Sequence, residues 1–178
     1  MKELRISNTL RLVPISLEFV QNIFEGFDEE VIEFLPIDNP PLLIEETISF
    51  IEHSIKQIKD GTDLVWVILY DENFIGCCGI HSIKSRQPHF GLWIKKDEQG
   101  KGYGKRIVDF MLYWALGKLD IDFIKYPVDK RNQKSIGLLK NHNAKFYGEY
   151  EMGNEKKLDV IEYRLYKDEK GNTANKEL

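Results

Sequence analysis

Residues 99 to 104 read Gln99-Gly100-Lys101-Gly102-Tyr103-Gly104, and they separate an apolar, strand-like run from an amphipathic, helix-like segment. Three glycines at alternate positions leave the backbone uncovered, so that several N–H groups can converge on one anion. The start of the following helix adds unpaired amides and the positive end of its dipole. Lys101, Lys105 and Arg106 add positive charge nearby. This stretch therefore predicts a seat for a phosphate, above all for a pyrophosphate.

Two well-known phosphate loops do not match this stretch. The dinucleotide fingerprint has the spacing G-x-G-x-x-G, whereas the glycines here have the spacing G-x-G-x-G. A Walker A loop requires G-x-x-x-x-G-K-[ST], but Gly104-Lys105 is followed by Arg106, and Gln99 stands where the first glycine would be. The spacing therefore excludes a P-loop nucleotide hydrolase.

The pattern that fits is Q/R-x-x-G-x-G/A, with Gln99, Gly102 and Gly104 at its fixed positions. In this loop the chain resembles the GCN5-related N-acetyltransferases, the GNAT family, and within it the ribosomal-protein N-terminal acetyltransferase-like branch. Three further segments, in the expected order, support the resemblance over roughly residues 8 to 166: Thr9-Leu10-Arg11-Leu12, Phe90-Gly91-Leu92-Trp93-Ile94 and Asn132-Gln133-Lys134-Ser135.

Composition and charge exclude several classes of partner. The chain has 178 residues, of which 42% are hydrophobic and 30% charged, as is typical of one globular domain. A net charge of −4 gives no electrostatic reason to bind nucleic acid or a membrane surface. The N-terminus has no apolar signal core, and no stretch approaches the roughly 20 apolar residues of a spanning helix. We expect one domain over residues 1–166, a polar C-terminal tail over residues 167–178, and neither a nucleic-acid nor a membrane partner.

Both cysteines are adjacent, as Cys77-Cys78, within an apolar strand-like run. Neighbouring side chains of a strand point to opposite faces, so a disulfide between them would be strained. We therefore expect two buried, reduced thiols and a reducing compartment, which indicates a cytoplasmic protein.

Hydrophobic periodicity predicts alternating strands and helices. A repeat of isoleucines at helical spacing indicates one long helix that ends at Asp60-Gly61: Ile44, Ile48, Ile51, Ile55 and Ile58. Ser16 is expected to cap an earlier helix. Further helices are expected after the glycine loop and over residues 132–141, with strands over residues 10–13, 64–70, 74–83, 88–95, 123–128, 144–152 and 156–167. Periodicity alone indicates only a mixed α/β chain.

The resemblance implies more about the fold and its ligand. It implies an α/β (α+β) fold, a single GNAT-like domain with a mixed, mostly antiparallel, splayed sheet flanked by helices. The split would lie between the strands that end near Lys95 and Val128 and would hold the pantetheine arm of acetyl-CoA, the cosubstrate; no metal is needed. The implied cofactor-binding residues are Leu92, Trp93, Ile94, Gln99, Gly100, Lys101, Gly102, Tyr103, Gly104, Lys105 and Asn132.

Catalytic residues are predicted from matched positions. Relatives often carry Glu before the Gly-Tyr-Trp-like segment, where this chain has His89. This histidine could take the acceptor's proton near neutral pH, or it could only hydrogen-bond within the strand or line the acceptor pocket. Many GNAT enzymes protonate the leaving thiolate with a Tyr, but Leu139 stands at that position. Ser135 is the nearest matched polar residue and the candidate acid; alternatively, its hydroxyl only contacts CoA or water.

The function implied is acetyl transfer from acetyl-CoA to a primary amine by direct attack in a ternary complex. The amine could belong to a protein N-terminus or to a small molecule, and the protein could be a monomer or a homodimer. Two further residues could serve the acceptor: Glu33 could attract a cationic amine, and His81 could reach the acceptor site. The alternative is a catalytically weak or inactive CoA-binding module or sensor of the same fold, which the departures at residues 89 and 139 suggest.

Overall fold

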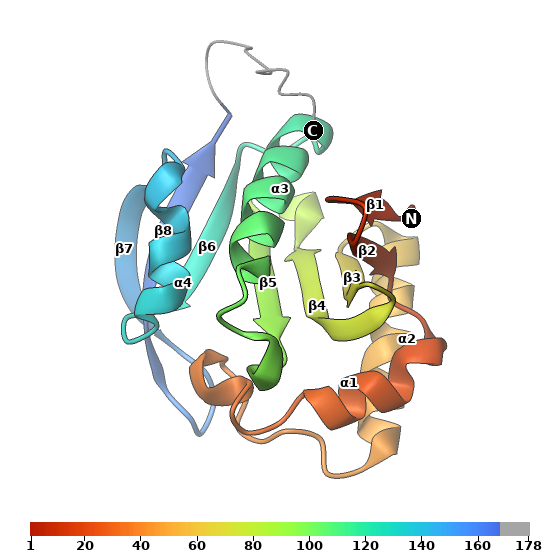
Figure 1. Cartoon of the computed structure of the whole chain (residues 1–178). Coiled ribbons are helices and arrows are strands. Elements are labelled where there is room, and N and C mark those ends of the chain that lie inside the picture. The colour runs from red at the N-terminus through yellow and green to blue at the C-terminus, as the bar shows by residue number, and fades with distance from the viewer. Residues whose placement is uncertain (168–178) are drawn as a thin grey trace.

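The computed structural model describes residues 1–167 (Figure 1). The tail expected over residues 167–178 lies, apart from Lys167, outside the described residues. The helices are α1 (Val20–Gly26), α2 (Ile44–Asp60), α3 (Tyr103–Lys118) and α4 (Gln133–Leu138). The strands are β1 (Leu4–Arg5), β2 (Leu10–Pro14), β3 (Leu64–Tyr70), β4 (Asn73–His81), β5 (His89–Ile94), β6 (Phe123–Asp129), β7 (Lys145–Met152) and β8 (Leu158–Tyr166). Short 3₁₀ turns are η1 (Leu17–Phe19), η2 (Ile32–Phe34), η3 (Ile83–Ser85), η4 (Lys96–Glu98) and η5 (Leu139–Asn141).

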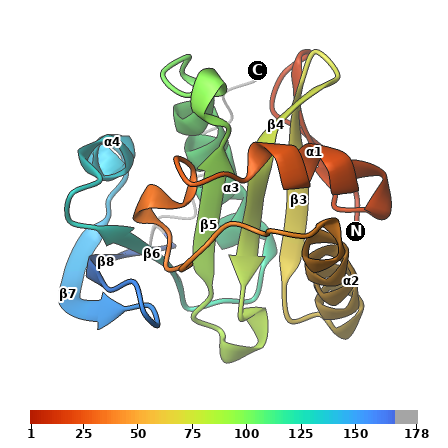
Figure 2. The same ribbon diagram turned by 90° about the horizontal axis from the view of Figure 1, so that it is seen from below.

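The strands form one mixed sheet in the order β1-β2-β3-β4-β5-β6-β8-β7. Neighbours are antiparallel except β5 and β6, which run parallel and share a single residue pair, His89 with Lys125. Beyond that pair the two strands diverge toward their carboxyl ends (Figures 1 and 2). The predicted sheet, mostly antiparallel and splayed between these two strands, is therefore confirmed.

Helices cover both faces of the sheet, and each helix buries its apolar side against the face that it covers. Helix α3 buries Ile107, Val108 and Met111 against one face, in the same cluster as Cys78. Helices α1 and α2 bury Ile23 and Ile51 against the other face, together with Cys77. Because the two adjacent cysteines enter different cores, both are buried free thiols, as expected. Burial raises the pKa of both thiols.

The order of the predicted elements is confirmed, with corrections at their ends. The helix expected after Ser16 begins as η1, and Ser16 makes no side-chain capping bond. The strand expected to reach Ile83 ends at His81, because Ser82 adopts a left-handed conformation that breaks the extended backbone. The short helix over residues 132–141 divides into α4 and η5. Strand β1, which pairs two residues with β2, was not predicted.

Candidate active site

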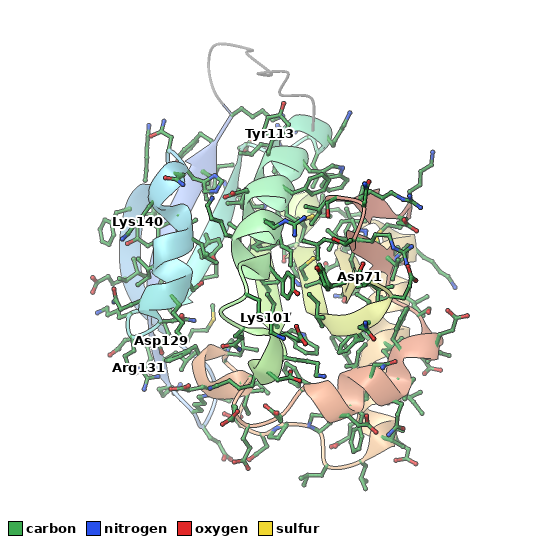
Figure 3. The ribbon with its side chains drawn as sticks, viewed as in Figure 1. Asp71, Lys101, Tyr113, Asp129, Arg131 and Lys140 are labelled. Atoms are coloured by element: carbon green, nitrogen blue, oxygen red, sulfur yellow. The ribbon has the colours of Figure 1, made fainter. Side chains whose placement is uncertain are left out.

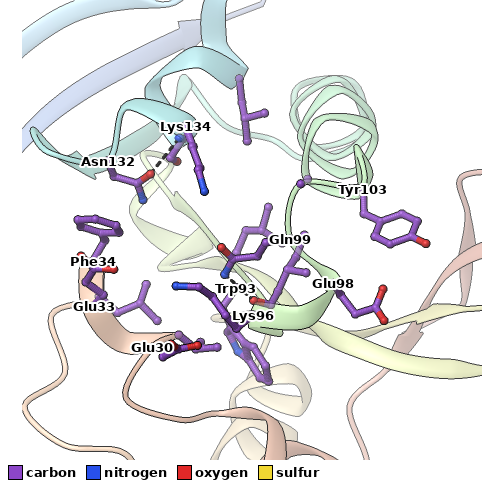
Figure 4. Close-up of a pocket in the computed structure, with 18 of the residues that line it drawn as sticks. Glu30, Glu33, Phe34, Trp93, Lys96, Glu98, Gln99, Tyr103, Asn132 and Lys134 are labelled. Atoms are coloured by element: carbon purple, nitrogen blue, oxygen red, sulfur yellow. Dashed lines mark hydrogen bonds between the residues drawn. The ribbon is translucent and has the colours of Figure 1, made fainter.

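A cavity of about 760 Å³ opens where β5 and β6 diverge, between the glycine loop, the start of α4 and the segment around η2 (Figure 4). The structure brings most of the predicted site residues to this cavity, namely Leu92, Trp93, Ile94, Gln99, Gly100, Gly102, Tyr103, Gly104, Lys105, Asn132 and Ser135. Two predicted residues, Lys101 and His89, are not among the residues that line it. Glu33, considered for the acceptor, is among them.

The glycine loop is held against the end of β5 by its own side chains. Gln99 donates its side-chain amide to the carbonyl oxygen of Ile94 at 2.9 Å. Gly102 is the N-cap of α3 with φ +86°, a left-handed conformation that a residue with a Cβ adopts only with strain. Helix α3 then begins at the cavity, so its first amides and its positive dipole end face the space that a phosphate would occupy.

The three cations that the sequence predicted near the phosphate seat do not all lie at the cavity. Lys105 lines the cavity, and its ammonium pairs with Asp109 one turn along α3. Lys101 instead pairs with Glu98 at 2.9 Å, and Arg106 donates to the Ser7 hydroxyl at 2.6 Å. Of these three cations, only Lys105 therefore lines the cavity.

The start of α4 forms a second wall of the cavity. Asn132 accepts the backbone N–H of Ser135 at 3.0 Å and so caps α4. Asp129, buried at the end of β6, orders the turn before it by binding both the backbone and the guanidinium of Arg131 (Figure 3). These hydrogen bonds hold the pKa of Asp129 below its usual value. The turn thus presents Asn132 and Ser135 to the cavity in a defined position.

The outer wall comes from η2 and its flanks, a segment that the sequence placed only loosely. It contributes Glu30, Val31, Glu33, Phe34 and Leu35 to the cavity. The β7–β8 turn holds this segment, because Lys156 donates its backbone N–H to Asp38 at 2.8 Å and its ammonium to the Ile32 carbonyl at 2.5 Å. Arg131 also lies 5.6 Å from the centre of the Phe34 ring. These contacts hold the η2 segment, which carries Glu30 and Glu33, against the β7–β8 turn and Arg131.

Aromatic packing defines the floor and one edge of the site. Trp93 lies edge-on to Phe27 and Phe74, at ring distances of 5.0 and 5.7 Å, so α1 and β4 hold its position. The Tyr103 ring points away from the centre of the cavity (Figure 4) and packs 4.7 Å from Tyr70. Tyr103 thus secures the first turn of α3 against the sheet.

His89, the predicted base, lies at the closed end of the split. It is half-buried, it pairs with Lys125 across the single β5–β6 contact, and its ring stacks 5.0 Å from that of His81. Burial, together with the neighbouring His81, lowers the pKa of His89 to about 4. A base with this pKa accepts protons weakly at neutral pH, so the position of His89 does not favour the role that the sequence predicted.

His89 should instead make stability depend on pH. The pKa of His89 is about 4 in the folded chain and 6.5 in the unfolded chain. Between pH 4 and pH 6.5 the unfolded chain therefore binds more protons than the folded chain. We expect the free energy of unfolding to fall as pH decreases from 6.5 to 4, by at most about 3 kcal/mol, and His89→Gln to reduce this fall. Urea unfolding across this range measures it, with the exposed His53→Gln as control. An unchanged slope in His89→Gln would contradict the assignment.

Ser135 lies where the sequence expected it, and it has an unforeseen partner. Its hydroxyl is 2.9 Å from that of Tyr126, a residue of β6 that is buried beneath α4. Burial raises the pKa of Tyr126, which therefore keeps its proton at neutral pH. Leu139, at the position of the usual tyrosine, is buried in the core and cannot take part. Tyr126 has no sequence signal, because only the fold brings β6 under α4.

A family model described as an acetyltransferase (GNAT) domain matches residues 9–145. The chain belongs to this family. Acetyltransferase PseH of Campylobacter jejuni is 27% identical over 105 residues, which cover 57% of this chain and 66% of PseH, slightly less than two thirds of its length.

Solved structures share the whole fold. RimL, a ribosomal L7/L12 α-N-protein acetyltransferase in complex with coenzyme A, has a TM-score of 0.79 at 18% identity, covering 93% of this chain and 98% of that one. Spermidine N-acetyltransferase from Vibrio cholerae, solved with CoA and spermine, has a TM-score of 0.75 at 18% identity, covering 90% and 96%. At such identities these structures confirm the GNAT fold.

Within residues 1–167 no group of three or more His, Cys, Asp or Glu side chains is arranged to hold a metal ion. No helix in the same range is long and apolar enough to cross a membrane.

Proposed function

We propose that this GNAT protein transfers the acetyl group of acetyl-CoA to a primary amine, by direct attack in a ternary complex. The observation that carries the proposal is one continuous cavity that joins the glycine loop to the end of β5, to the start of α4 and to an outer wall that carries two glutamates. The glycine loop and the exposed edge of β5 would position acetyl-CoA, and the carboxylates of the outer wall would attract the ammonium form of an amine.

The residues present fit acetyl-CoA. Backbone amides at Gly102, Gly104 and the start of α3 would hold the pyrophosphate, with Lys105 adding charge. The exposed edge of β5 at Leu92 and Ile94, and the side chain of Asn132, would hold the pantetheine arm. Bound acetyl-CoA supplies an activated thioester, so the protein needs to align, deprotonate and stabilise charge. A backbone N–H near Trp93 would stabilise the oxyanion, and Ser135 with Tyr126 would supply the proton for the thiolate.

Two carboxylates of the outer wall would attract a cationic acceptor, although Lys96 and Arg131 also line the cavity. Glu30 and Glu33 both line it, and the Lys156 and Arg131 contacts described above fix the segment that carries them. An ammonium group, at a protein N-terminus or in a small amine, would be drawn to these carboxylates. A cytoplasmic location accompanies the proposal and is supported by the free, buried thiols of Cys77 and Cys78.

A second function, CoA binding without turnover, is favoured by one observation. Leu139 is buried and cannot protonate the thiolate, and His89 has a pKa of about 4. A CoA-binding sensor would need neither group.

The deciding experiment measures CoA thiol release from acetyl-CoA with a panel of amines, including spermidine and a peptide with an N-terminal serine, and measures CoA binding in parallel. We expect binding, together with release that depends on one class of amine. Binding without release from any amine would favour the sensor. Absence of CoA binding would contradict both functions, because both assign the glycine loop to the pyrophosphate.

A further inference from the structure

A carboxylate–imidazole pair is formed by residues of β4 and of the segment before β3, outside the residues that line the cavity, and the roles assigned above do not use it. His81, the last residue of β4, places Nδ1 2.7 Å from the carboxylate of Asp63, which lies just before β3. Asp63 is 5% exposed and also accepts the backbone N–H of Ser82 at 3.2 Å. In the neutral imidazole, a proton on Nδ1 would be donated to this carboxylate, and Nε2 would then be an acceptor.

The Nε2 atom of His81 lies over a strip of sheet without side chains. Gly79 of β4 and Gly91 of β5 are cross-strand partners. A Cβ added to Gly79 would lie 2.6 Å from His81 Nε2, and one added to Gly91 would lie 3.5 Å from it. The two glycines therefore leave the room that the imidazole occupies, and the ring extends along the strands from its own position toward residues 79 and 91.

This strip leads to the cavity. Directly paired residues of two strands share a sheet face, so the pairs His81–His89, Gly79–Gly91 and Cys77–Trp93 lie in successive rows on one face. Trp93 lines the cavity. Rows two residues apart are separated by about 7 Å, so Nε2, over the glycine row, is about one row from the tryptophan. The His81 side chain as a whole is 31% exposed.

The neighbouring groups distinguish the two histidines. His81 has the buried Asp63 carboxylate as its partner, whereas His89 stacks on His81 and lies beside Lys125 of β6. The Asp63 carboxylate fixes the orientation of the His81 ring, and among the hydrogen bonds of residues 1–167 none joins His89 to a carboxylate. Of the two stacked histidines, His81 is therefore the one that a carboxylate orients.

We propose that His81, oriented by Asp63, is the base that deprotonates the acceptor amine. This inference rests on the proposed function. The N–H bond of the acceptor ammonium breaks and its proton moves to His81 Nε2; the freed nitrogen lone pair attacks the thioester carbon; the C–S bond breaks. The second proton lost from the nitrogen balances the thiolate, which leaves as a thiol. His81 then releases its proton to solvent, so one proton is produced for each acetyl group transferred.

The test compares His81→Gln with His89→Gln, using the acceptor that gives thiol release in the wild-type protein. Glutamine at 81 retains a donor for Asp63, which protects the fold. We expect His81→Gln to lower kcat about 100-fold or more, to remove the acidic limb of the pH–rate profile, and to leave CoA affinity unchanged. His89→Gln should retain that limb. An acidic limb that persists in His81→Gln would overturn the proposal.

Asp63→Asn tests whether Asp63 orients the His81 ring, and the measurement needs no acceptor amine. Nitrogen NMR of the imidazoles should show His81 protonated at Nδ1 alone at neutral pH in the wild type, and this preference should be lost in Asp63→Asn. A wild-type His81 protonated at Nε2 would overturn the proposal. If the wild type turned over none of the amines, the proposed function would fail and the role of His81 with it; an active wild type with an unaffected His81→Gln would refute only the role.

Discussion

Replacing Gly104 by aspartate is expected to lower CoA affinity at least about 100-fold, because like charges brought together in a binding site cost several kcal/mol. Gly104 is the second residue of α3 and lines the cavity. A Cβ there would lie 3.6 Å from Ile94 Cδ1 and 3.7 Å from Leu138 Cδ1, which is ordinary contact. A carboxylate in the first turn of a helix also interacts favourably with its dipole. The fold should therefore tolerate the change while the phosphate seat becomes repulsive.

Calorimetric titration with CoA measures the effect, and Gly117→Asp provides the control. Gly117 lies near the other end of α3, is exposed, and has no atom within 4 Å of an added Cβ. This variant adds the same charge to the same helix away from the cavity and should bind CoA like the wild type. Wild-type affinity in a folded Gly104→Asp protein would show that the glycine loop is not the pyrophosphate seat.

Replacing Gly76 by alanine is expected to lower the free energy of unfolding by about 3 kcal/mol, the upper part of the range for overpacked sites. Gly76 has φ +155° and lies in β4 against the backbone of β5. An added Cβ would lie 2.2 Å from the Trp93 carbonyl oxygen and 2.9 Å from Ile94 Cα. Neither atom can move without shifting the part of β5 that lines the cavity, so weaker CoA binding should accompany the loss of stability.

Urea unfolding of Gly76→Ala measures this effect against Gly148→Ala. Gly148 is also a strand glycine, in β7, and an added Cβ there meets no atom within 4 Å. We expect Gly148→Ala to change stability by less than about 1 kcal/mol. Equal unfolding free energies for the two variants would show that β5 accommodates the added carbon.

The sequence predicted the architecture well because the relevant signals are local. The isoleucine repeat gave the whole of α2, with Gly61 in the left-handed conformation expected of a helix-ending residue. The glycines of residues 100–104 gave the start of α3, and alternating apolar runs gave the central strands. The strand end at Ser82 and the missing Ser16 cap were not foreseen, because both depend on how neighbouring segments pack.

The spacing of nearby residues was enough to predict the element order, the glycine loop, the resemblance to the GNAT family and the burial of Cys77 and Cys78. The packed fold was needed to show that, of the two stacked histidines His81 and His89, it is His81 that has a carboxylate partner. It placed Asp63 against His81, Tyr126 under Ser135 and Lys156 on the segment that carries Glu33. These contacts join separate elements of the chain, and their existence depends on strand register and on the divergence of β5 from β6, which no local pattern encodes.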